Sequence, residues 1–262
     1  MKLDLYQIDA FTDTIFGGNP ACVVPLDAWL ADDILLKIAK ENAVAETAFF
    51  VNKGEKIHLR WFTPEIEMDL CGHATLATAH CLKTILHDQR DTFVFETLSG
   101  DLTVVAENDF YHLDFPARMP LPDLLPENIE QALSIKPKEV FKARDYVLVY
   151  ENEAEVRNIG IDRQLFDQIN LGTGGVIVTA IGDKSDFVSR FFTPQASILE
   201  DPVTGSAHCS LIPFWANRLH KNTLYALQVS ERLGKLFCEN KNERVIISGQ
   251  AKTYAIGHLW IP

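Results

Sequence analysis

Short apolar runs, some alternating and some continuous, predict that this chain is rich in strands. Glycine, proline and small polar residues separate the runs, as expected for turns. In the first half we expect strands at 3–11, 21–24, 47–51, 57–62, 92–95, 102–105 and 111–115. In the second half we expect strands at 146–150, 176–180, 187–192, 225–230, 235–238, 245–248 and 251–261.

Three segments have helical length instead. Residues 32–40 show helical spacing with acidic residues near the start, which the helix dipole favours. Residues 74–86 and 206–219 are apolar or small on nearly every side. Helices of that kind are normally buried all round, so we expect one such helix at the centre of each half of the chain.

The same order of motifs occurs twice. Trp-Phe-Thr-Pro at 61–64 is followed by Asp69, by Cys-Gly-His-Ala at 71–74 and by the first buried helix. Phe-Phe-Thr-Pro at 191–194 is followed by Asp201, by Thr-Gly-Ser-Ala at 204–207 and by the second. Coincidence in a short pattern is the alternative. The two segments agree both in the types of predicted elements and in residue identities, which predicts an internal repeat.

A cluster of prolines between residues 116 and 126 marks the expected boundary between the halves, because proline interrupts helices and inner strands. We therefore predict an N-terminal half at 1–116, to which a C-terminal strand at about 252–262 returns, and a C-terminal half at 117–262. The fold class is α+β. Each half is expected to be a curved, mainly antiparallel sheet around its helix, and the two halves to face one another across a cleft.

Composition narrows the function. The 262 residues carry a formal net charge of −12, which argues against a general nucleic-acid binder. The odd number of cysteines, five, predicts reduced thiols and a cytoplasmic protein. We find neither the apolar core of a signal peptide at the N-terminus nor an apolar run of membrane-spanning length, so no membrane association is expected.

Both buried helices begin at a glycine followed by a polar residue. These pairs are Gly72 with His73 and Gly205 with Ser206. Free backbone N–H groups and the helix dipole favour an anion at such a position, and glycine allows close approach. Capping by Ser206 or Thr204 is the alternative. Two equivalent helix starts favour a shared anion site.

Three further side chains could transfer or orient protons. Glu46 lies in an apolar stretch, where a carboxylate loses solvation, but an exposed or paired glutamate fits the sequence equally well. His73 could donate to a substrate or shuttle protons, or simply pack or cap. Asp201 could orient a histidine or a substrate amine, or be an ordinary acidic loop residue.

We expect structural roles for Cys71, His80 and His208. A thiol beside a helix start can act as a base, but the equivalent position in the second half is Thr204, so Cys71 is expected to pack. No Cys-x-x-Cys or His-Glu-x-x-His motif is present, and we expect no metal. His80 and His208 are expected to be buried helix residues with hydrogen-bond partners.

Four segments, at 7–24, 42–50, 62–80 and 200–209, resemble the PhzF-like family of phenazine-biosynthesis proteins, in the same order. That family belongs to the diaminopimelate-epimerase-like superfamily. The resemblance implies that Glu46 is the general acid/base, that Gly72 and His73 form the first Gly-His pair, and that Asp201 belongs to the second motif. It further implies that Gly205 and Ser206 hold a substrate carboxylate. A homodimer is expected from the same pattern.

We therefore expect a cofactor-independent isomerase that acts on a small anionic metabolite. Glu46 would remove a proton from carbon and return it elsewhere on the molecule, while His73 and Asp201 assist. Two alternatives remain open. One is a racemase or epimerase that uses Cys71, and the other is a non-catalytic protein that binds a metabolite or a partner.

Overall fold

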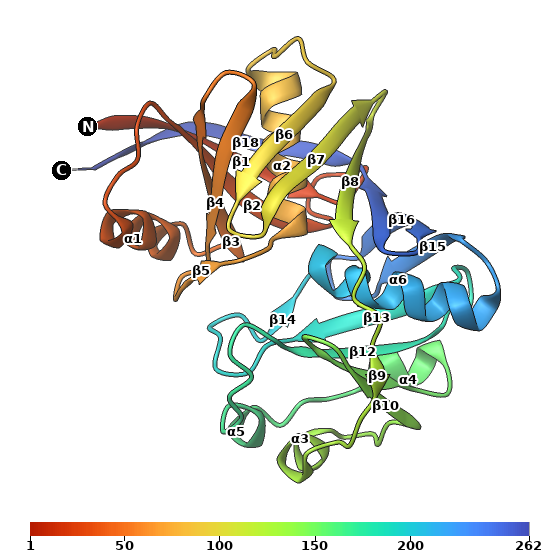
Figure 1. The fold of residues 1–262 in the computed structure, drawn as a ribbon. Coiled ribbons are helices and arrows are strands. Elements are labelled where there is room, and N and C mark those ends of the chain that lie inside the picture. The colour runs from red at the N-terminus through yellow and green to blue at the C-terminus, as the bar shows by residue number, and fades with distance from the viewer. Residues whose placement is uncertain (262) are drawn as a thin grey trace. The chain divides into compact units, whose positions relative to one another are not determined.

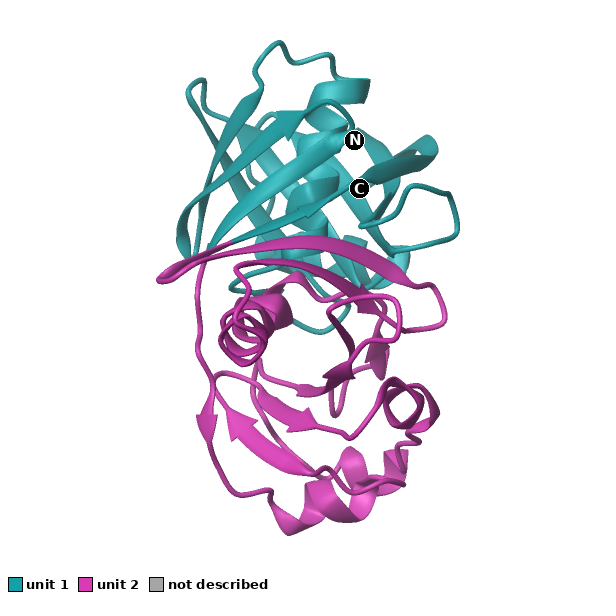
Figure 2. Cartoon of the chain, turned by 90° about the vertical axis from the view of Figure 1, so that its right-hand side faces the viewer, with its two compact units in different colours: residues 1–115, 246–262 teal, residues 116–245 magenta. Residues whose placement is uncertain are grey.

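The computed structural model describes residues 1–261, and these form two compact units (Figure 2). Unit 1 consists of residues 1–115 and 246–262, and unit 2 of residues 116–245, so that the C-terminal segment returns to the first unit. Residue 262, the last of the predicted returning strand, lies outside the described residues. The α+β prediction, with one buried helix in each half, is confirmed.

Unit 1 contains nine strands, one long buried helix with a π-helical turn, and one outer helix. They are β1 (Lys2–Ala10), β2 (Asn19–Leu26), α1 (Asp32–Asn42), β3 (Glu46–Asn52), β4 (Lys56–Phe62), β5 (Glu67–Met68), α2 (Gly72–His80), η1 (Cys81–Ile85), β6 (Thr92–Thr97), β7 (Gly100–Glu107), β8 (Phe110–Pro116) and β18 (Ala251–Trp260). Figure 1 shows α2 enclosed by the strands of this unit.

Helix α2 is buried at all nine of its residues and packs on β1, β2 and β3. Its sequence, GHATLATAH, consists largely of small residues, which let strands approach on every side. The hydroxyls of Thr75 and Thr78 donate to the carbonyls of Cys71 and Ala74, so that no threonine donor is stranded in the core. The predicted helix at 74–86 is thus an α-helix that begins at Gly72 and continues into the π-helical turn.

Unit 2 has a second sheet around a second buried helix. Its elements are β9 (Leu121–Pro122), α3 (Glu127–Ala132), β10 (Glu139–Lys142), β11 (Tyr146–Val149), α4 (Glu153–Asn158), α5 (Arg163–Phe166), β12 (Val176–Ile181), β13 (Phe187–Phe192), β14 (Glu200–Asp201), α6 (Gly205–Leu219), β15 (Thr223–Gln228) and β16 (Gly234–Lys241). A further strand, β17 (Arg244–Gly249), leads from unit 2 into unit 1.

Helix α6 carries a proline in its interior. Pro213 has no N–H to donate to the carbonyl of Cys209, which would be left without its helical partner. The backbone N–H of Arg118 donates to that carbonyl instead, at 2.8 Å. A buried helix can therefore contain a proline here, because the segment after β8 supplies the missing hydrogen bond.

The strands of the two units pair in the same order. In unit 1, β1 and β2 are antiparallel, β2 and β3 parallel, and β3 and β4 antiparallel; β4 then pairs with β5 antiparallel and with β6 parallel. In unit 2 the same relations connect β10, β11, β12, β13, β14 and β15. The buried helix of each unit follows the two-residue strand β5 or β14, so both helix starts have equivalent places.

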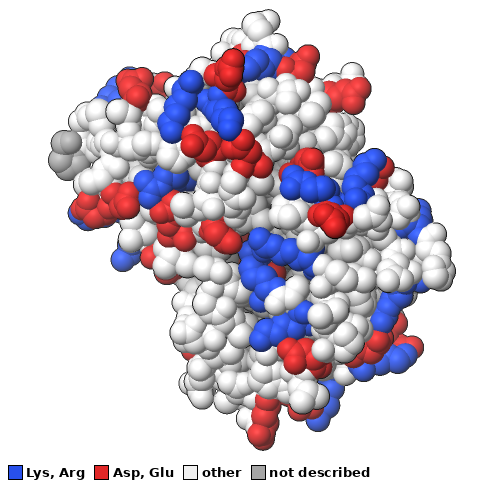
Figure 3. Space-filling view, in the orientation of Figure 1, with Lys and Arg blue, Asp and Glu red and all other residues white. Residues whose placement is uncertain are grey.

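The first strand of each repeated set has one further antiparallel partner outside the set. β18 pairs with β1 in unit 1, and β9 pairs with β10 in unit 2. On the face drawn in Figure 3, patches of Lys and Arg side chains lie beside patches of Asp and Glu side chains, with uncharged surface between them. No helix within residues 1–261 is both long and apolar enough to cross a membrane.

Replacing Leu76 by alanine tests the structural role of α2. Leu76 is fully buried, so the change should lower the free energy of unfolding by about 2–5 kcal/mol through lost burial and a residual cavity. Leu98→Ala is the control, because Leu98 is 69% exposed and should change stability by less than about 0.5 kcal/mol. Urea denaturation measures both, and equal effects would contradict a central role for α2.

Candidate functional site

Glu46 is the first residue of β3 and lies directly after the turn that ends α1. Ala43 in this turn has φ of 51°, and Asn42 donates to the Thr47 hydroxyl at 3.1 Å, which fixes the entry into the strand. The Glu46 side chain is only 12% exposed. Its Oε2 atom lies 3.1 Å from Nε2 of His73, yet neither atom makes an aligned hydrogen bond. The carboxylate is therefore buried but not locked in place.

His73 is held from its opposite side. It is the second residue of α2 and is 2% exposed. The side-chain amide Nδ2 of Asn19 lies 3.1 Å from its Nδ1, and Sγ of Cys71 lies 3.6 Å from the same nitrogen. In the neutral form of His73, an Asn19 N–H that donates to Nδ1 leaves the ring proton on Nε2, where it faces Glu46.

Charge in this cluster resides on Glu46 and His73 rather than on sulfur. Burial, reinforced by the Glu46 carboxylate, raises the pKa of the Cys71 thiol to about 11. Burial by itself would lower the pKa of His73, but Cys71 and the Glu46 carboxylate outweigh it and raise that pKa well above its ordinary value. Since Cys71 is a neutral thiol near pH 7, the Glu46 carboxylate is the charge that favours a protonated His73.

The ligand-type atoms of Glu46, Cys71 and His73 lie within 4.8 Å of one another, a spacing that a metal ion could bridge. However, Cys71 faces Nδ1 of the imidazole whereas Glu46 faces Nε2. The two nitrogens point to different sides of the ring, so an ion bound to one nitrogen would lie on the side of only one of the two neighbours.

Neither buried helix is capped by its N-cap side chain. Cys71 and Thr204 occupy the N-cap positions of α2 and α6, and neither accepts a capping hydrogen bond. Thr204 is engaged elsewhere, because its hydroxyl donates to Asp201 at 2.5 Å. The first turn of each helix also has no acidic residue. The capping alternative for Thr204 is therefore wrong, and an anion remains a suitable partner for both helix starts.

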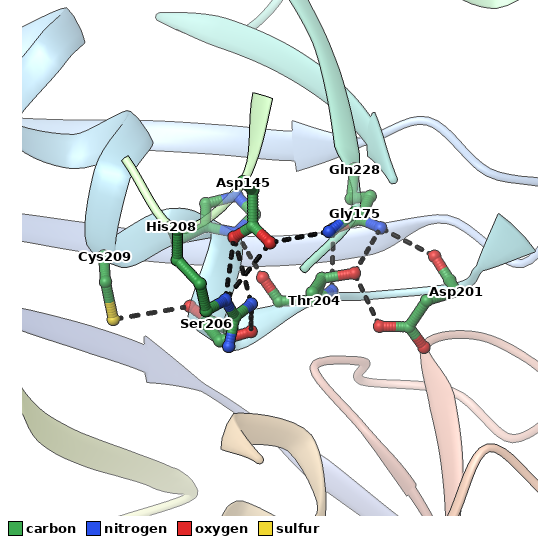
Figure 4. Close-up of polar contacts among 10 residues, drawn as sticks. Asp145, Gly175, Asp201, Thr204, Ser206, His208, Cys209 and Gln228 are labelled. Carbon is green, nitrogen blue, oxygen red and sulfur yellow. Dashed lines mark hydrogen bonds and ion pairs between the residues drawn. The ribbon is translucent and has the colours of Figure 1, made fainter. Parts of the chain in front are cut away.

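Asp201 is the last residue of β14 and lies just before α6. Figure 4 shows Thr204 between Asp201 and Gln228. Gln228 is fully buried; its Oε1 accepts from the Thr204 backbone N–H at 2.8 Å, and its Nε2 donates to the Asp201 carbonyl at 2.8 Å. Asp201 thus orients Thr204 within unit 2.

A buried ion pair adjoins the start of α6. Asp145, 1% exposed, binds the Arg144 guanidinium at 3.0–3.2 Å and accepts from the Gly175 N–H at 2.9 Å. Arg144 Nη2 also donates to the Ser206 hydroxyl at 2.9 Å. Sequence reasoning missed Arg144 and Asp145, as well as Asn19 and Gln228. Asn19 lay in a predicted turn, and the others have no distinctive spacing.

The two units differ at the position that Glu46 occupies in unit 1. Thr47 pairs with Phe62 and Val176 pairs with Phe192, so the matching Phe-Thr-Pro motifs align Glu46 with Gly175. A Cβ atom at Gly175 would lie 2.4 Å from the Phe191 ring. Unit 2 therefore has neither an acid/base group nor space for one at this position.

His80 and His208 are structural, as predicted. His80 contacts the Tyr111 and Thr253 hydroxyls at 3.0 Å, and His208 bonds to the Thr204 carbonyl at 2.8 Å. Burial lowers the pKa of both to about 4, so both are neutral at physiological pH. The hydrogen bond from His208 to the Thr204 carbonyl helps to hold the first turn of α6.

Known proteins were compared with the chain. The family model described as phenazine biosynthesis-like protein matches residues 8–257. The chain belongs to this family. A curated relative from Pseudomonas aeruginosa is 48% identical over 99% of both chains and is named an uncharacterized isomerase. The phenazine biosynthesis-like family thus includes isomerases, and the prediction of an isomerase of this family is confirmed.

Solved structures agree with the fold. A PhzF-family protein from Enterococcus faecalis superposes with a TM-score of 0.93, at 46% identity and full coverage of both chains. A hydroxyproline epimerase from Agrobacterium vitis, at 10% identity, has a TM-score of 0.63 over 98% of this chain and 92% of its own. The phenazine biosynthesis-like chain therefore shares its fold with epimerases.

The titration of His73 tests the coupling to Glu46. In wild type, the pKa of His73 should lie above its ordinary value, whereas Glu46→Gln should lower that pKa, because the contribution of the neighbouring carboxylate is lost. Side-chain ¹⁵N NMR measures this titration. His208 is the internal control and should stay neutral down to about pH 4 in both proteins.

The same pair has a consequence for stability. A folded-state pKa above the unfolded value of 6.5 means that His73 stabilises the fold fully below pH 6.5 and loses this contribution as the pH rises through the folded pKa. An unchanged His73 titration in Glu46→Gln would refute the coupling.

Proposed function

We propose that this protein is a cofactor-independent isomerase in which Glu46 moves a proton between two positions of a small carboxylate substrate. The observation that carries the proposal is the placement of Glu46 Oε2. It is buried, 3.1 Å from His73 Nε2, and makes no aligned hydrogen bond. Such a carboxylate is shielded from water yet able to accept a proton from a ligand, as general acid–base catalysis requires.

The chemistry is balanced without a redox partner. Glu46 takes a proton from carbon, and the C–H electron pair moves into an enol-like system. The proton on Glu46 then returns to another carbon of the same molecule, so substrate and product are isomers. His73 lies close to Glu46 and is itself the second residue of α2. Its ring stabilises the developing negative charge together with the backbone N–H groups of Gly72 and His73.

A carboxylate group of the substrate is proposed to bind at the start of α6. The N–H groups of Gly205 and Ser206 and the Ser206 hydroxyl would donate to it, and Asp201 would act by holding Thr204 and the loop before the helix. Support comes from the missing cap and the absence of acidic residues in the first turn. The substrate itself is proposed only as this class, a small anionic metabolite.

Thiol-dependent racemisation has less support. It needs two bases, and the equivalents of Cys71 and Glu46 in unit 2 are Thr204 and Gly175. Burial also raises the pKa of Cys71 to about 11, which disfavours a thiolate near neutral pH. One carboxylate that both removes and returns the proton needs neither a second base nor a reactive thiol.

Glu46→Gln tests the proton transfer. Ligands are first found by a thermal-shift screen of small carboxylates, and deuterium uptake into each hit is then followed by NMR in D₂O. The variant keeps the side-chain shape but not the base, so exchange should fall by about 10²–10⁴-fold. Glu41→Gln, at an exposed position on α1, is the control and should exchange like wild type. Ligand binding with no exchange in wild type would instead indicate a non-catalytic binding protein.

Cys71→Ala separates the two enzyme mechanisms. If Cys71 only packs beside His73, the variant should keep deuterium exchange within about tenfold of wild type, since no charged form of the thiol takes part. A loss of exchange as large as that of Glu46→Gln, in a variant that melts as a folded protein, would favour the thiol mechanism.

A further inference from the structure

Arg144 is clamped between a buried carboxylate and the start of α6. Its Nε and Nη2 atoms donate to Asp145 at 3.0–3.2 Å, and Nη2 also donates to Ser206 Oγ at 2.9 Å. Asp145 is in turn fixed by the N–H of Gly175, as Figure 4 shows. The side chain of Arg144 is 16% exposed and that of Asp145 1% exposed. The guanidinium is therefore rigid and largely shielded from water.

The contact determines how Ser206 can bond. A guanidinium has donors only, so the Ser206 oxygen must be the acceptor in this pair. The Ser206 hydroxyl proton is then available to donate to another group. Hydrogen bonds polarise one another along a chain, so donation from Arg144 makes the serine O–H a stronger donor. Ser206 is also the second residue of α6, where the backbone N–H groups point out of the helix.

We propose that Arg144 is a positioning residue that turns the Ser206 hydroxyl toward a bound carboxylate and makes this helix start selective for an anion over a neutral ligand of the same shape. The inference rests on the proposed carboxylate site at Gly205 and Ser206. It adds that the selectivity comes from the Asp145–Arg144–Ser206 chain and not from the helix dipole alone.

The test compares two probes of equal size, acetate and acetamide. Their dissociation constants are measured from the backbone N–H shifts of Gly205 and Ser206 in ¹H–¹⁵N NMR spectra. Wild type should prefer acetate. Arg144→Met should weaken acetate binding by about ten- to a hundredfold, because the Ser206 hydroxyl is then no longer held as a donor to the carboxylate, and leave acetamide within about threefold. A merely structural role would weaken both probes alike.

Two controls make the comparison specific. Arg218→Met removes another arginine of unit 2 that forms a two-point ion pair, with Glu139, and should leave the acetate-to-acetamide ratio unchanged. Arg144→Met alone leaves the Asp145 carboxylate buried without its cation, which can destabilise the unit. The double variant Arg144→Met/Asp145→Asn removes that charge and should show the same loss of anion preference.

The route through Ser206 is tested by a double-mutant cycle. If Arg144 acts through the hydroxyl, adding Arg144→Met to Ser206→Ala should change acetate affinity by less than about threefold. Fully additive losses would overturn that route, and an unchanged ratio in both Arg144 variants would overturn the inference while leaving the carboxylate site intact. No acetate shift at Gly205 and Ser206 in wild type would overturn the proposed site itself.

Discussion

The close approach of Glu46 to His73 is the contact on which the rest of unit 1 depends. The two residues are 27 positions apart, and their atoms meet at 3.1 Å only because a strand start and a helix start converge. Helix α2 must be buried on every side to bring its first turn beside β3. Small side chains along the helix allow this, since a larger residue at any face would hold a strand away.

Equivalent backbone positions in the two units carry different chemistry. Both units form the same pairings and place an uncapped helix after a two-residue strand. Where unit 1 has Glu46 and His73, unit 2 has Gly175 and Ser206. The Phe191 ring fills the space that a side chain at Gly175 would need. The shared backbone thus provides two similar helix starts, and only one of them carries a group that can exchange protons near neutral pH.

The sequence predicted the long strands and buried helices because their signals are local. Alternating and continuous apolar residues show, within a short stretch of sequence, which positions are buried and which are exposed. The short elements β5, β14 and α3–α5 were missed, because two to six residues are too few for a period. Site partners were missed for another reason. Asn19 meets His73 across 54 residues and Arg144 meets Ser206 across 62, and no spacing rule covers such contacts.

The free-energy cost of buried polar atoms bears on the Glu46–His73 pair. A buried polar atom without an aligned partner costs about 1–3 kcal/mol, and most folds avoid it. Elsewhere in the described chain, His80 and Thr78 satisfy their polar groups within the fold. Glu46 Oε2 and His73 Nε2 lie 3.1 Å apart without an aligned hydrogen bond, and His208 Nε2 inside α6 also has no partner among the described residues. A missing partner alone therefore does not mark a site, and what distinguishes the Glu46–His73 pair is that a carboxylate and an imidazole face one another at the start of a buried helix.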